Sequence, residues 1–380
     1  MTCEMSRQVQ LLSGKAIDVP AEVATVEELL ASLAGVLAVP VSHLRLVVNG
    51  ELWQERGGTL PDGDEITPAR LSVVVVRPPR AFFGTRDGAL VVWDLVAKCP
   101  EVVLREDGIG VSAVAVDFSA HRAAVGTTDG QLQLWDLTSA ACQQSCEAHS
   151  AAISGLKWSV AAQRCVSCSG DASVKLWDTG TTPIGHLCTF EEHLAGVGWI
   201  SAHFPSQCAV SASEDATLRV WDLSAQTCRG VLQGHNSSVR AVHLDVHACR
   251  ILSAADDGAL MVWDLHSLAC LSTLPAPISS ATTLCLVADF GAGFAITGTS
   301  RGHLHVWDLH TCAHQCTIPT TTQLPVWSLD ADFAAQKAMA ADTSGEFVIV
   351  DLGRKEVTHV QRVHDGYGWG LLVRAELSHL

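Results

Sequence analysis

The sequence predicts a mainly β chain in which a small α+β module precedes seven repeated units, each of four short strands. Two observations predict this class. A Trp-Asp dipeptide recurs at intervals of 42 to 44 residues, and the runs between its copies have strand length without a helical period. Residues 7–77 lack the repeat and show a different order of strands and one helix.

The repeat is the strongest signal in the chain, because internal periodicity of this length marks repeat architectures. Its six copies are Trp93-Asp94, Trp135-Asp136, Trp177-Asp178, Trp221-Asp222, Trp263-Asp264 and Trp307-Asp308. A degenerate seventh copy, Val350-Asp351, follows 43 residues after the sixth tryptophan. The spacing predicts seven equivalent units.

Each unit reads as four strands separated by turns. Within residues 149–178, strand-length runs occupy the segments 153–158, 164–168 and 174–178, and turn residues lie between them. A fourth strand follows each Trp-Asp, as in residues 141–147. The pattern predicts one small sheet for each period.

These motifs resemble the WD-repeat (WD40) family over about residues 80–380. The resemblance implies a seven-bladed β-propeller at residues 78–380, in which the sheets pack radially about a central channel. It also implies that the chain binds other proteins and is not an enzyme. Such repeats bury their apolar faces only against neighbours, so the ring must close.

The family holds each blade together with a His, a Ser or Thr, an Asp and the Trp, and three units supply the whole set. The sets are His149, Ser167, Asp171 and Trp177; His193, Ser211, Asp215 and Trp221; and His235, Ser253, Asp257 and Trp263. A buried Trp needs an acceptor for its N–H, which such a chain of polar groups can provide. Because the set recurs once per unit, we interpret it as architecture and predict no catalytic residue.

The outer units depart from this pattern. Phe83 and Val125 stand at the Ser position of the first two units, and Arg301 replaces the turn Asp of the sixth, which keeps Thr297. Val350 replaces the tryptophan of the seventh. We therefore expect the middle blades to be the most regular.

The N-terminal module, residues 1–77, is predicted to contain a hairpin, a helix and two further strands. Thr25 and Glu28 have the spacing of a capping box at the helix start. The element order, with the phrases at residues 45–50 and 59–60, resembles the ubiquitin superfamily (the β-grasp fold). The resemblance places a recognition patch at Leu12, Val47 and Val74. The alternative is that these are ordinary apolar strand residues.

The module cannot be conjugated as ubiquitin is, because the chain continues through residues 77–80 without a terminal Gly-Gly. A working module would therefore be a docking surface for ubiquitin-type receptors.

Closure of the first blade has two candidate strands. Residues 71–76 have the right offset from Trp93, but they are also the last strand of the ubiquitin-like module. Residues 370–375 follow His364 as an inner strand follows His149. We favour the C-terminal strand, because joining the two chain ends in one sheet removes free edges.

Composition limits the partners. The chain has 24 Lys and Arg against 40 Asp and Glu, a net charge of −16, and no basic stripe. Nucleic acid and anionic membranes are therefore not expected as partners. No apolar run approaches the ~18 residues of a membrane span. Without a visible secretory signal, the 14 cysteines are expected to be reduced, in the cytoplasm or the nucleus.

No cofactor or metal is predicted. Neither glycine-rich nucleotide-binding motif is present. Cys165-x-x-Cys168 has half of a zinc pattern, but it lies in a predicted strand and no second pair follows. Cys142, Cys228 and Cys270 each come seven residues after a Trp and are predicted to be buried in outer strands.

Propellers of this family usually bind partners on the narrow face, at the mouth of the channel. Residues just before the turn Asp point there, among them Arg86, Glu214 and Asp256. Trp199 and Trp327 lie outside the repeat position near inner strands, where they are either core residues or contacts. We predict that these five residues contact a protein partner.

Two functions remain open at this stage. One is a protein-binding adaptor, acting as a monomeric propeller within a larger complex and linked to the ubiquitin system through the N-terminal module. The other is a structural scaffold for signalling, trafficking or cytoskeletal complexes without a ubiquitin link.

Overall fold

A computed structural model of the chain describes two compact units. The described residues are 6–11, 16–20, 26–37, 44–48, 51–52, 71–75, 80–85, 87–95, 97–105, 109–275, 277, 281–362 and 374–375. One unit comprises Met1–Pro79 with Leu95–Ala97, and the other comprises Arg80–Asp94 and Lys98–Leu380.

The first unit contains a five-stranded sheet and a helix. Its elements are β1 (Ser6–Leu11), β2 (Ala16–Pro20), α1 (Val26–Leu37), β3 (Leu44–Val48), β4 (Glu51–Leu52) and β5 (Leu71–Val75). The strand order is β2-β1-β5-β3-β4, with β1 and β5 parallel. Leu29 and Leu33, one helical turn apart on α1, are both buried.

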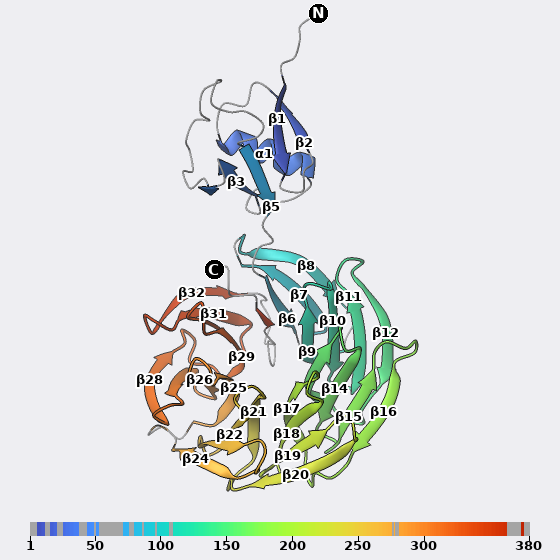
Figure 1. Cartoon of the computed structure of the whole chain (residues 1–380), viewed down its shortest axis with the longest axis vertical. Coiled ribbons are helices and arrows are strands. Elements are labelled where there is room, and N and C mark those ends of the chain that lie inside the picture. Colours follow the sequence, from blue (N-terminus) through green and yellow to red (C-terminus); the bar gives the residue numbers. More distant parts are fainter. Residues whose placement is uncertain are drawn as a thin grey trace, which may run out of the picture. The chain divides into compact units, whose positions relative to one another are not determined.

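The second unit is a ring of seven four-stranded antiparallel sheets (Figure 1). This confirms the predicted seven-bladed β-propeller. We number the sheets blades 1 to 7 in chain order. In blades 2 to 7 the first strand of each unit lines the channel and the fourth lies outermost.

The bounds of the strands follow the repeat. Blade 1 contains β6 (Arg80–Gly84), β7 (Ala89–Asp94), β8 (Cys99–Arg105) and β33 (Arg374–Ala375). Blade 2 contains β9 (Val111–Asp117), β10 (Arg122–Thr127), β11 (Gln131–Asp136) and β12 (Ala141–Glu147). Blade 3 contains β13 (Ile153–Ser159), β14 (Arg164–Ser169), β15 (Val174–Asp178) and β16 (Gly185–Phe190). Blade 4 contains β17 (Val197–His203), β18 (Cys208–Ser213), β19 (Thr217–Asp222) and β20 (Thr227–Gln233). Blade 5 contains β21 (Val239–Asp245), β22 (Arg250–Ala255), β23 (Leu260–Asp264) and β24 (Cys270–Leu274). Blade 6 contains β25 (Thr283–Asp289), β26 (Phe294–Thr299), β27 (His303–Asp308) and β28 (Ala313–Pro319). Blade 7 contains β29 (Val326–Asp332), β30 (Lys337–Asp342), β31 (Glu346–Asp351) and β32 (Glu356–Arg362).

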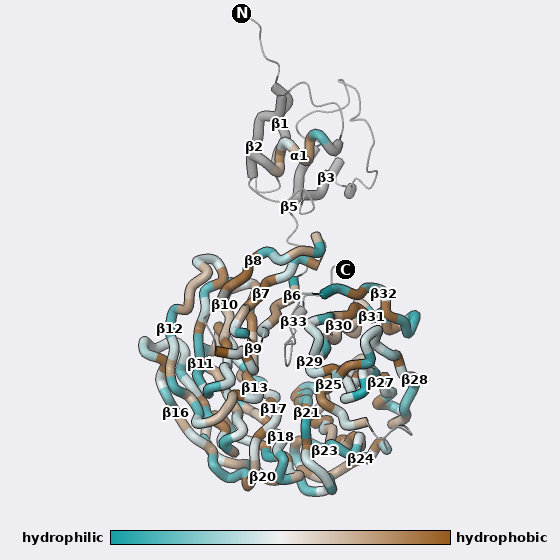
Figure 2. The backbone as a smooth tube through the Cα atoms, turned by 180° about the vertical axis from the view of Figure 1, so that it is seen from behind, coloured by the Kyte–Doolittle hydropathy of each residue, from teal (hydrophilic) through white to brown (hydrophobic). Residues whose placement is uncertain are grey.

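The burial of each strand follows its place in the blade. Every residue of β18 is buried, because neighbouring blades cover both of its faces. Small and apolar side chains fill such strands, whereas exposure alternates along the outermost strand β12, which has one solvated face. Figure 2 shows hydrophobic stretches along the blades and hydrophilic ones at many connecting turns.

The hydrophobic core lies between adjacent blades. One cluster joins Val166 and Leu176 of blade 3 to Ile200 and Trp221 of blade 4, and similar clusters join the other neighbours from blade 1 to blade 7. Each blade is therefore stabilised by its neighbours.

Blades 7 and 1 are joined by aromatic packing. Phe347 of β31 stacks on Phe83 of β6 with ring centroids 5.2 Å apart, and it meets Trp93 edge-on at 6.1 Å. Phe83 thus stands at the Ser position of blade 1 because it helps to close the ring.

The C-terminal strand completes blade 1, as favoured from the sequence. β33 pairs antiparallel with β6, so that Arg374 lies opposite Phe82. β5, in contrast, pairs with β1 and β3 in the first unit. His364 lies outside the described residues. Among the described helices, none has the length and hydrophobicity needed to cross a membrane.

Candidate functional site

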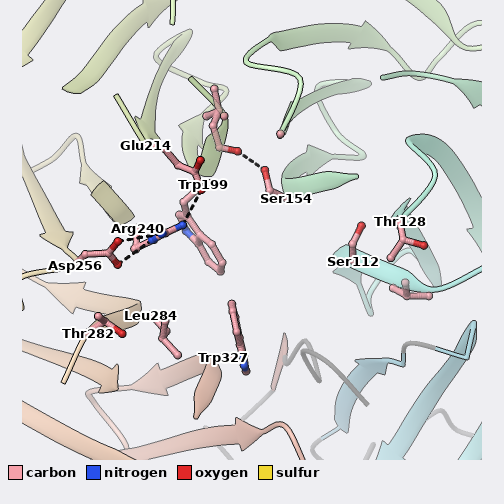
Figure 3. Close-up of a pocket in the computed structure, with 15 residues that line it drawn as sticks. Ser112, Thr128, Ser154, Trp199, Glu214, Arg240, Asp256, Thr282, Leu284 and Trp327 are labelled. Carbon is pink, nitrogen blue, oxygen red and sulfur yellow. Dashed lines mark hydrogen bonds and ion pairs between the residues drawn. The ribbon is translucent and has the colours of Figure 1, made fainter. Parts of the chain in front are cut away.

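One pocket collects most of the residues predicted to contact a partner. It lies at the N-terminal ends of the channel-lining strands and has a volume of about 710 Å³, within the range of ligand sites (Figure 3). We call it the channel-mouth pocket. Its lining is Val111, Ser112, Thr128, Ser154, Gly170, Gly196, Val197, Gly198, Trp199, Glu214, Arg240, Asp256, Thr282, Leu284 and Trp327.

Four of the five predicted contact residues line this pocket: Glu214, Asp256, Trp199 and Trp327. Arg86, the fifth, lies outside the described residues. Both indole rings project into the pocket (Figure 3). Trp199 also packs against the core between blades 4 and 5, so it is both a core residue and a lining residue.

Backbone hydrogen bonds fix the two acidic residues at the mouth. The amide of Glu214 donates to the carbonyl of Gly196 at 2.9 Å, and the amide of Asp256 donates to that of Ser238 at 2.9 Å. Each bond ties the turn before the third strand of a blade to the start of its first strand. Glu214 and Asp256 therefore occupy equivalent positions in blades 4 and 5.

Arg240 joins the two carboxylates, and the sequence analysis missed it. Its Nε and Nη2 donate to the two oxygens of Asp256, both at 2.9 Å, and its Nη1 donates to Oε1 of Glu214 at 2.9 Å (Figure 3). A bidentate pair of this kind is among the stronger side-chain interactions. Its hydrogen bond to Asp256 raises the pKa of Arg240, so the guanidinium stays charged.

The reason for missing Arg240 is a β-bulge. The pairing of β21 with β22 shifts between Val239 and Ala241, which leaves Arg240 without a cross-strand partner. A bulge changes the direction of a side chain, so side chains no longer alternate between the two faces of the strand as a sequence-based prediction assumes. The repeat spacing could have found it, because Arg240 lies 42 residues after Gly198 and 44 before Leu284.

A second cavity, of about 410 Å³, continues along the channel beside the middle parts of the same strands. Its charged or titratable lining residues are Lys157, His243 and Asp330. Burial, followed by the charge of Lys157, lowers the pKa of His243 to about 4, so this histidine is neutral at pH 7.

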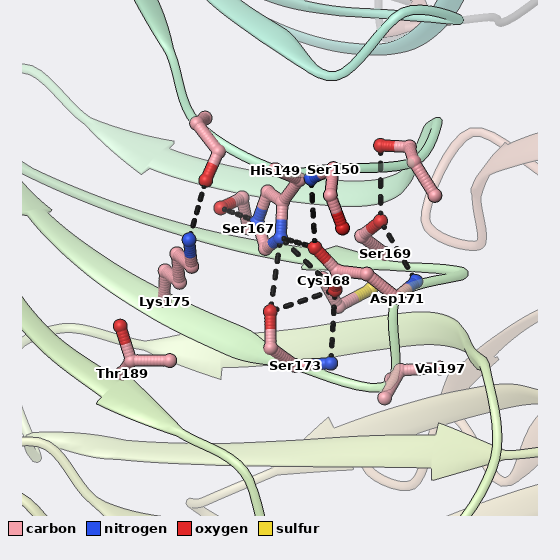
Figure 4. Close-up of polar contacts among 12 residues, drawn as sticks. His149, Ser150, Ser167, Cys168, Ser169, Asp171, Ser173, Lys175, Thr189 and Val197 are labelled. Atoms are coloured by element: carbon pink, nitrogen blue, oxygen red, sulfur yellow. Dashed lines mark hydrogen bonds and ion pairs between the residues drawn. The ribbon is translucent and has the colours of Figure 1, made fainter.

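The four-residue sets lie inside the blades, away from this pocket. In blade 3, the Trp177 indole N–H donates to Ser167 Oγ at 2.9 Å. Ser167 Oγ lies 2.7 Å from His149 Nε2 (Figure 4). His149 Nδ1 lies 3.0 Å from Asp171 Oδ2. Blade 4 repeats the arrangement, with Trp221 to Ser211 at 2.8 Å, Ser211 to His193 at 2.7 Å and His193 to Asp215 at 2.8 Å.

The charges in these sets follow from burial. Burial lowers the pKa of His149 and His193, and the neighbouring aspartates offset this only in part. Burial alone would raise the pKa of Asp171, but hydrogen bonds from Ser173 outweigh it and lower this pKa to about 2. Each histidine is thus neutral at pH 7, with its proton on Nδ1 facing an ionised aspartate.

Blade 5 forms only part of the predicted set, which corrects the prediction for Asp257. Trp263 donates to Ser253 at 2.8 Å and Ser253 lies 2.6 Å from His235, but the buried Nδ1 of His235 has no hydrogen-bond partner. Asp257 is exposed, and its carboxylate accepts from the backbone amide of Ala259 at 3.0 Å. Ala259 stands where Ser173 of blade 3 holds its aspartate by a hydroxyl, so that restraint is missing.

The irregular blades replace the missing groups. In blade 2, where Val125 cannot accept, Trp135 donates to Oε1 of Gln133 at 3.0 Å. In blade 6, Trp307 donates to Thr297 at 3.1 Å. In blade 7 the buried Asp342, two residues before the expected position, accepts from Ser344.

The cysteines show no site chemistry. Cys165 and Cys168 are fully buried, and burial raises the pKa of both thiols, that of Cys168 to about 12. No group of three or more metal-binding side chains occurs in the part of the chain that the structure describes. The predicted burial of Cys142, Cys228 and Cys270 is wrong: the first two are half-buried and Cys270 is exposed, because one face of each outermost strand is solvated.

The predicted patch of the N-terminal module is only partly covered by the structure. The pairing of β3 with β5 puts Arg45 opposite Val74 and Val47 opposite Ser72. Leu12 lies outside the described residues.

These features define the chain as a seven-bladed β-propeller protein with its candidate site at one mouth of the channel. The chain carries WD40 repeats: the family described as "WD domain, G-beta repeat" matches residues 140–178, 185–222 and 226–264, which lie in blades 2 to 5. The crystal structure of the computationally designed Ika8 protein is similar in fold, with a TM-score of 0.60 and 21% identity over 74% of this chain and 83% of that one. A search of curated proteins found no match.

Proposed function

We propose that this chain is a non-catalytic platform that binds a partner protein at the channel-mouth pocket. The convergence of Trp199, Trp327, Glu214 and Asp256 on one pocket carries the proposal. Aromatic residues and arginine dominate the energetics of protein interfaces, and this pocket holds both. WD40 propellers are in general binding scaffolds.

An exposed leucine close to the pocket lining in sequence supports the proposal. Leu194 is 90% exposed and lies two residues before Gly196, which lines the pocket. A partner that covers the pocket could bury this side chain at its rim, where an exposed apolar residue favours association.

The burial of the Ser-His-Asp groups supports the non-catalytic reading. Ser167, Ser211 and Ser253 are each 0% exposed, and each serves the tryptophan of its own blade. A substrate carbonyl would have no route to these hydroxyls, although a nucleophile must reach its substrate to within about 3.5 Å.

The experiment compares two arginines of blade 5 that each pair with an aspartate. Arg240 pairs with Asp256 at 2.9 Å in the pocket, and Arg250 pairs with Asp264 at 2.7 Å outside its lining. Quantitative affinity purification should show partners lost by Arg240→Gln and retained by Arg250→Gln, with both variants folded. Partners retained by both variants would contradict a site at the channel mouth.

A second proposal concerns the N-terminal unit. We propose that it is a ubiquitin-like domain that docks ubiquitin-type receptors, which would make the chain an adaptor linked to the ubiquitin system. The sheet order β2-β1-β5-β3-β4, with β1 parallel to β5, supports this. A scaffold of signalling, trafficking or cytoskeletal complexes is the alternative. Receptor binding that is lost in Val47→Asp supports the first, and no receptor binding by the wild type favours the second.

The remaining expectations belong to the same proposal. We propose a boundary between residues 77 and 78, a monomeric propeller within a larger complex, and a reducing location in the cytoplasm or the nucleus. The described cysteines are free thiols, which fits such a location.

A further inference from the structure

Six blades each carry one β-bulge at the same place, two residues or fewer from the start of the channel-lining strand. The strand register skips one residue at each bulge, and these bulged residues are Ser112, Ser154, Gly198, Arg240, Leu284 and Trp327. All six line the channel-mouth pocket. The fold thus places one residue from each of blades 2 to 7 at the pocket, and we call these residues the bulge ring.

The bulge-ring residues are small in blades 2 to 4 and large in blades 5 to 7. Blades 2 to 4 contribute Ser112, Ser154 and Gly198, whereas blades 5 to 7 contribute Arg240, Leu284 and Trp327. At Gly198 an added Cβ would meet no atom closer than 3.9 Å. The space for a ligand group therefore lies over blades 2 to 4.

The residues that line the channel-mouth pocket carry a net negative charge. Glu214, Arg240 and Asp256 are the only charged residues that line the pocket in the described part of the chain, which gives a net charge of −1. Asp256 uses both of its oxygens for Arg240, but Glu214 uses only Oε1. The Glu214 side chain is 50% exposed, so its Oε2 can accept from a ligand.

The same contacts select against other ligands. An anion at Arg240 would lie beside the carboxylates of Glu214 and Asp256, to which three of the five guanidinium N–H groups already donate, and these two carboxylates would repel it. A purely apolar group would cover Glu214 and displace the water that solvates its carboxylate. It would supply no hydrogen-bond donor in place of that water. A cation, in contrast, can bind Glu214 and lie against indole faces, which attract positive charge.

We propose that the channel-mouth pocket takes one lysine or arginine side chain, carried by an extended segment of the partner protein. This inference rests on the proposed function and specifies the chemistry of its site. The cationic group lies against Glu214, over the small side of the bulge ring. Trp199 and Trp327 contact the aliphatic stem, which both residue types provide.

The test selects peptides from a random library displayed on phage, using the full-length chain as bait. Enriched peptides should share a Lys or Arg. Binding of a synthetic copy is then measured by fluorescence polarisation, with that residue retained or replaced by norleucine. The replacement should weaken binding about tenfold or more, because it removes a charge-assisted hydrogen bond.

Matched variants locate the peptide. Glu214 and Glu192 are 50% and 49% exposed, and each accepts from an arginine Nη1, at 2.9 and 2.7 Å, but only Glu214 lines the pocket. Glu214→Gln should weaken binding about tenfold, whereas Glu192→Gln should leave it unchanged. Gly198→Leu should abolish binding by filling the space, at an unchanged melting temperature.

The outcomes separate the two claims. Peptides that are blocked by Gly198→Leu but share no Lys or Arg would overturn the cation inference and leave the proposed site intact. The same holds if Glu214→Gln and Glu192→Gln bind equally well. If no peptide is enriched, or if the enriched ones bind Gly198→Leu as well as wild type, both the inference and the proposed site are contradicted.

Discussion

At the scale of single residues, buried tryptophans organise the blades through one N–H each. The acceptor differs from blade to blade: Ser211 for Trp221, Gln133 for Trp135 and Thr297 for Trp307. In each of blades 2 to 6 the indole N–H of the repeat tryptophan has an acceptor. A buried donor without an acceptor would cost about 1–3 kcal/mol.

Trp221→Ala should lower the free energy of unfolding by about 3–5 kcal/mol, since Trp221 is 0% exposed and packs between blades 3 and 4. Trp221→Phe, which keeps a ring but removes the donor, should cost less. Urea titrations of the three proteins measure this. Equal midpoints for wild type and Trp221→Ala would contradict the structural role of the tryptophan.

His305 should make stability depend on pH. Burial, followed by the charges of His314 and His303, lowers its pKa from 6.5 to about 4. The unfolded chain therefore binds a proton first as the pH falls below about 6.5, and stability falls until about pH 4.

His305→Gln should reduce this loss by an amount of order 1–3 kcal/mol, since each unit of pKa shift corresponds to about 1.4 kcal/mol. Gln133 occupies the equivalent place in blade 2, two residues before the tryptophan, so the change suits the fold. Thermal melts at pH 7 and pH 4.5 measure the effect. An identical loss in wild type and variant would exclude His305 as its source.

At the scale of elements, the sequence located strands and turns well but not every side-chain contact. The turn position before each Asp predicted that Glu214 and Asp256 lie at the channel mouth, and both line the pocket there. It did not indicate Arg240, because a bulge reverses the alternation at that residue. It wrongly paired Asp257 with His235, because Ala259 removes the hydroxyl that would hold the carboxylate.

Asp215→Asn and Asp257→Asn should therefore differ in effect. Asp215 lies 2.8 Å from His193 and also accepts from Thr217, and these contacts lower its pKa to about 2. Losing the charge should cost about 1.5–3 kcal/mol in blade 4 and less than about 1 kcal/mol in blade 5. Urea unfolding at pH 7 measures both. Equal costs for the two variants, or a larger cost for Asp257→Asn, would contradict the difference between blades 4 and 5.

The stability from Asp215 should also disappear in acid. Its pKa is depressed below the ordinary 3.8, so its contribution is present above about pH 4 and is lost as the pH falls toward 2. Asp215→Asn should lack this part of the acid dependence.

At the scale of the whole molecule, the sequence predicted the number of blades, because six tryptophans and one valine recur at the same position of the repeat. The sequence left two candidates for the strand that closes the first blade, because both segments had a suitable position. The strand that pairs with β6 lies almost 300 residues away in the chain. The contact of Phe347 with Phe83 was likewise invisible, since it joins blades 7 and 1.

Deleting residues 365–380 should unfold the propeller, because it removes β33 and leaves β6 as a free edge. Loss of the cooperative thermal transition, measured by circular dichroism and calorimetry, is the expected result. A truncated chain that stays soluble with a wild-type transition would show that the ring closes without β33.

The central claim is that a partner protein binds in the channel-mouth pocket, and site-specific photo-crosslinking tests it most directly. A photoreactive residue is placed at Thr128, which is exposed and lines the pocket, and as a control at Leu271, half exposed on the outermost strand β24 of blade 5. The account predicts partner adducts at position 128 and none at position 271. Adducts at position 271 alone would contradict it.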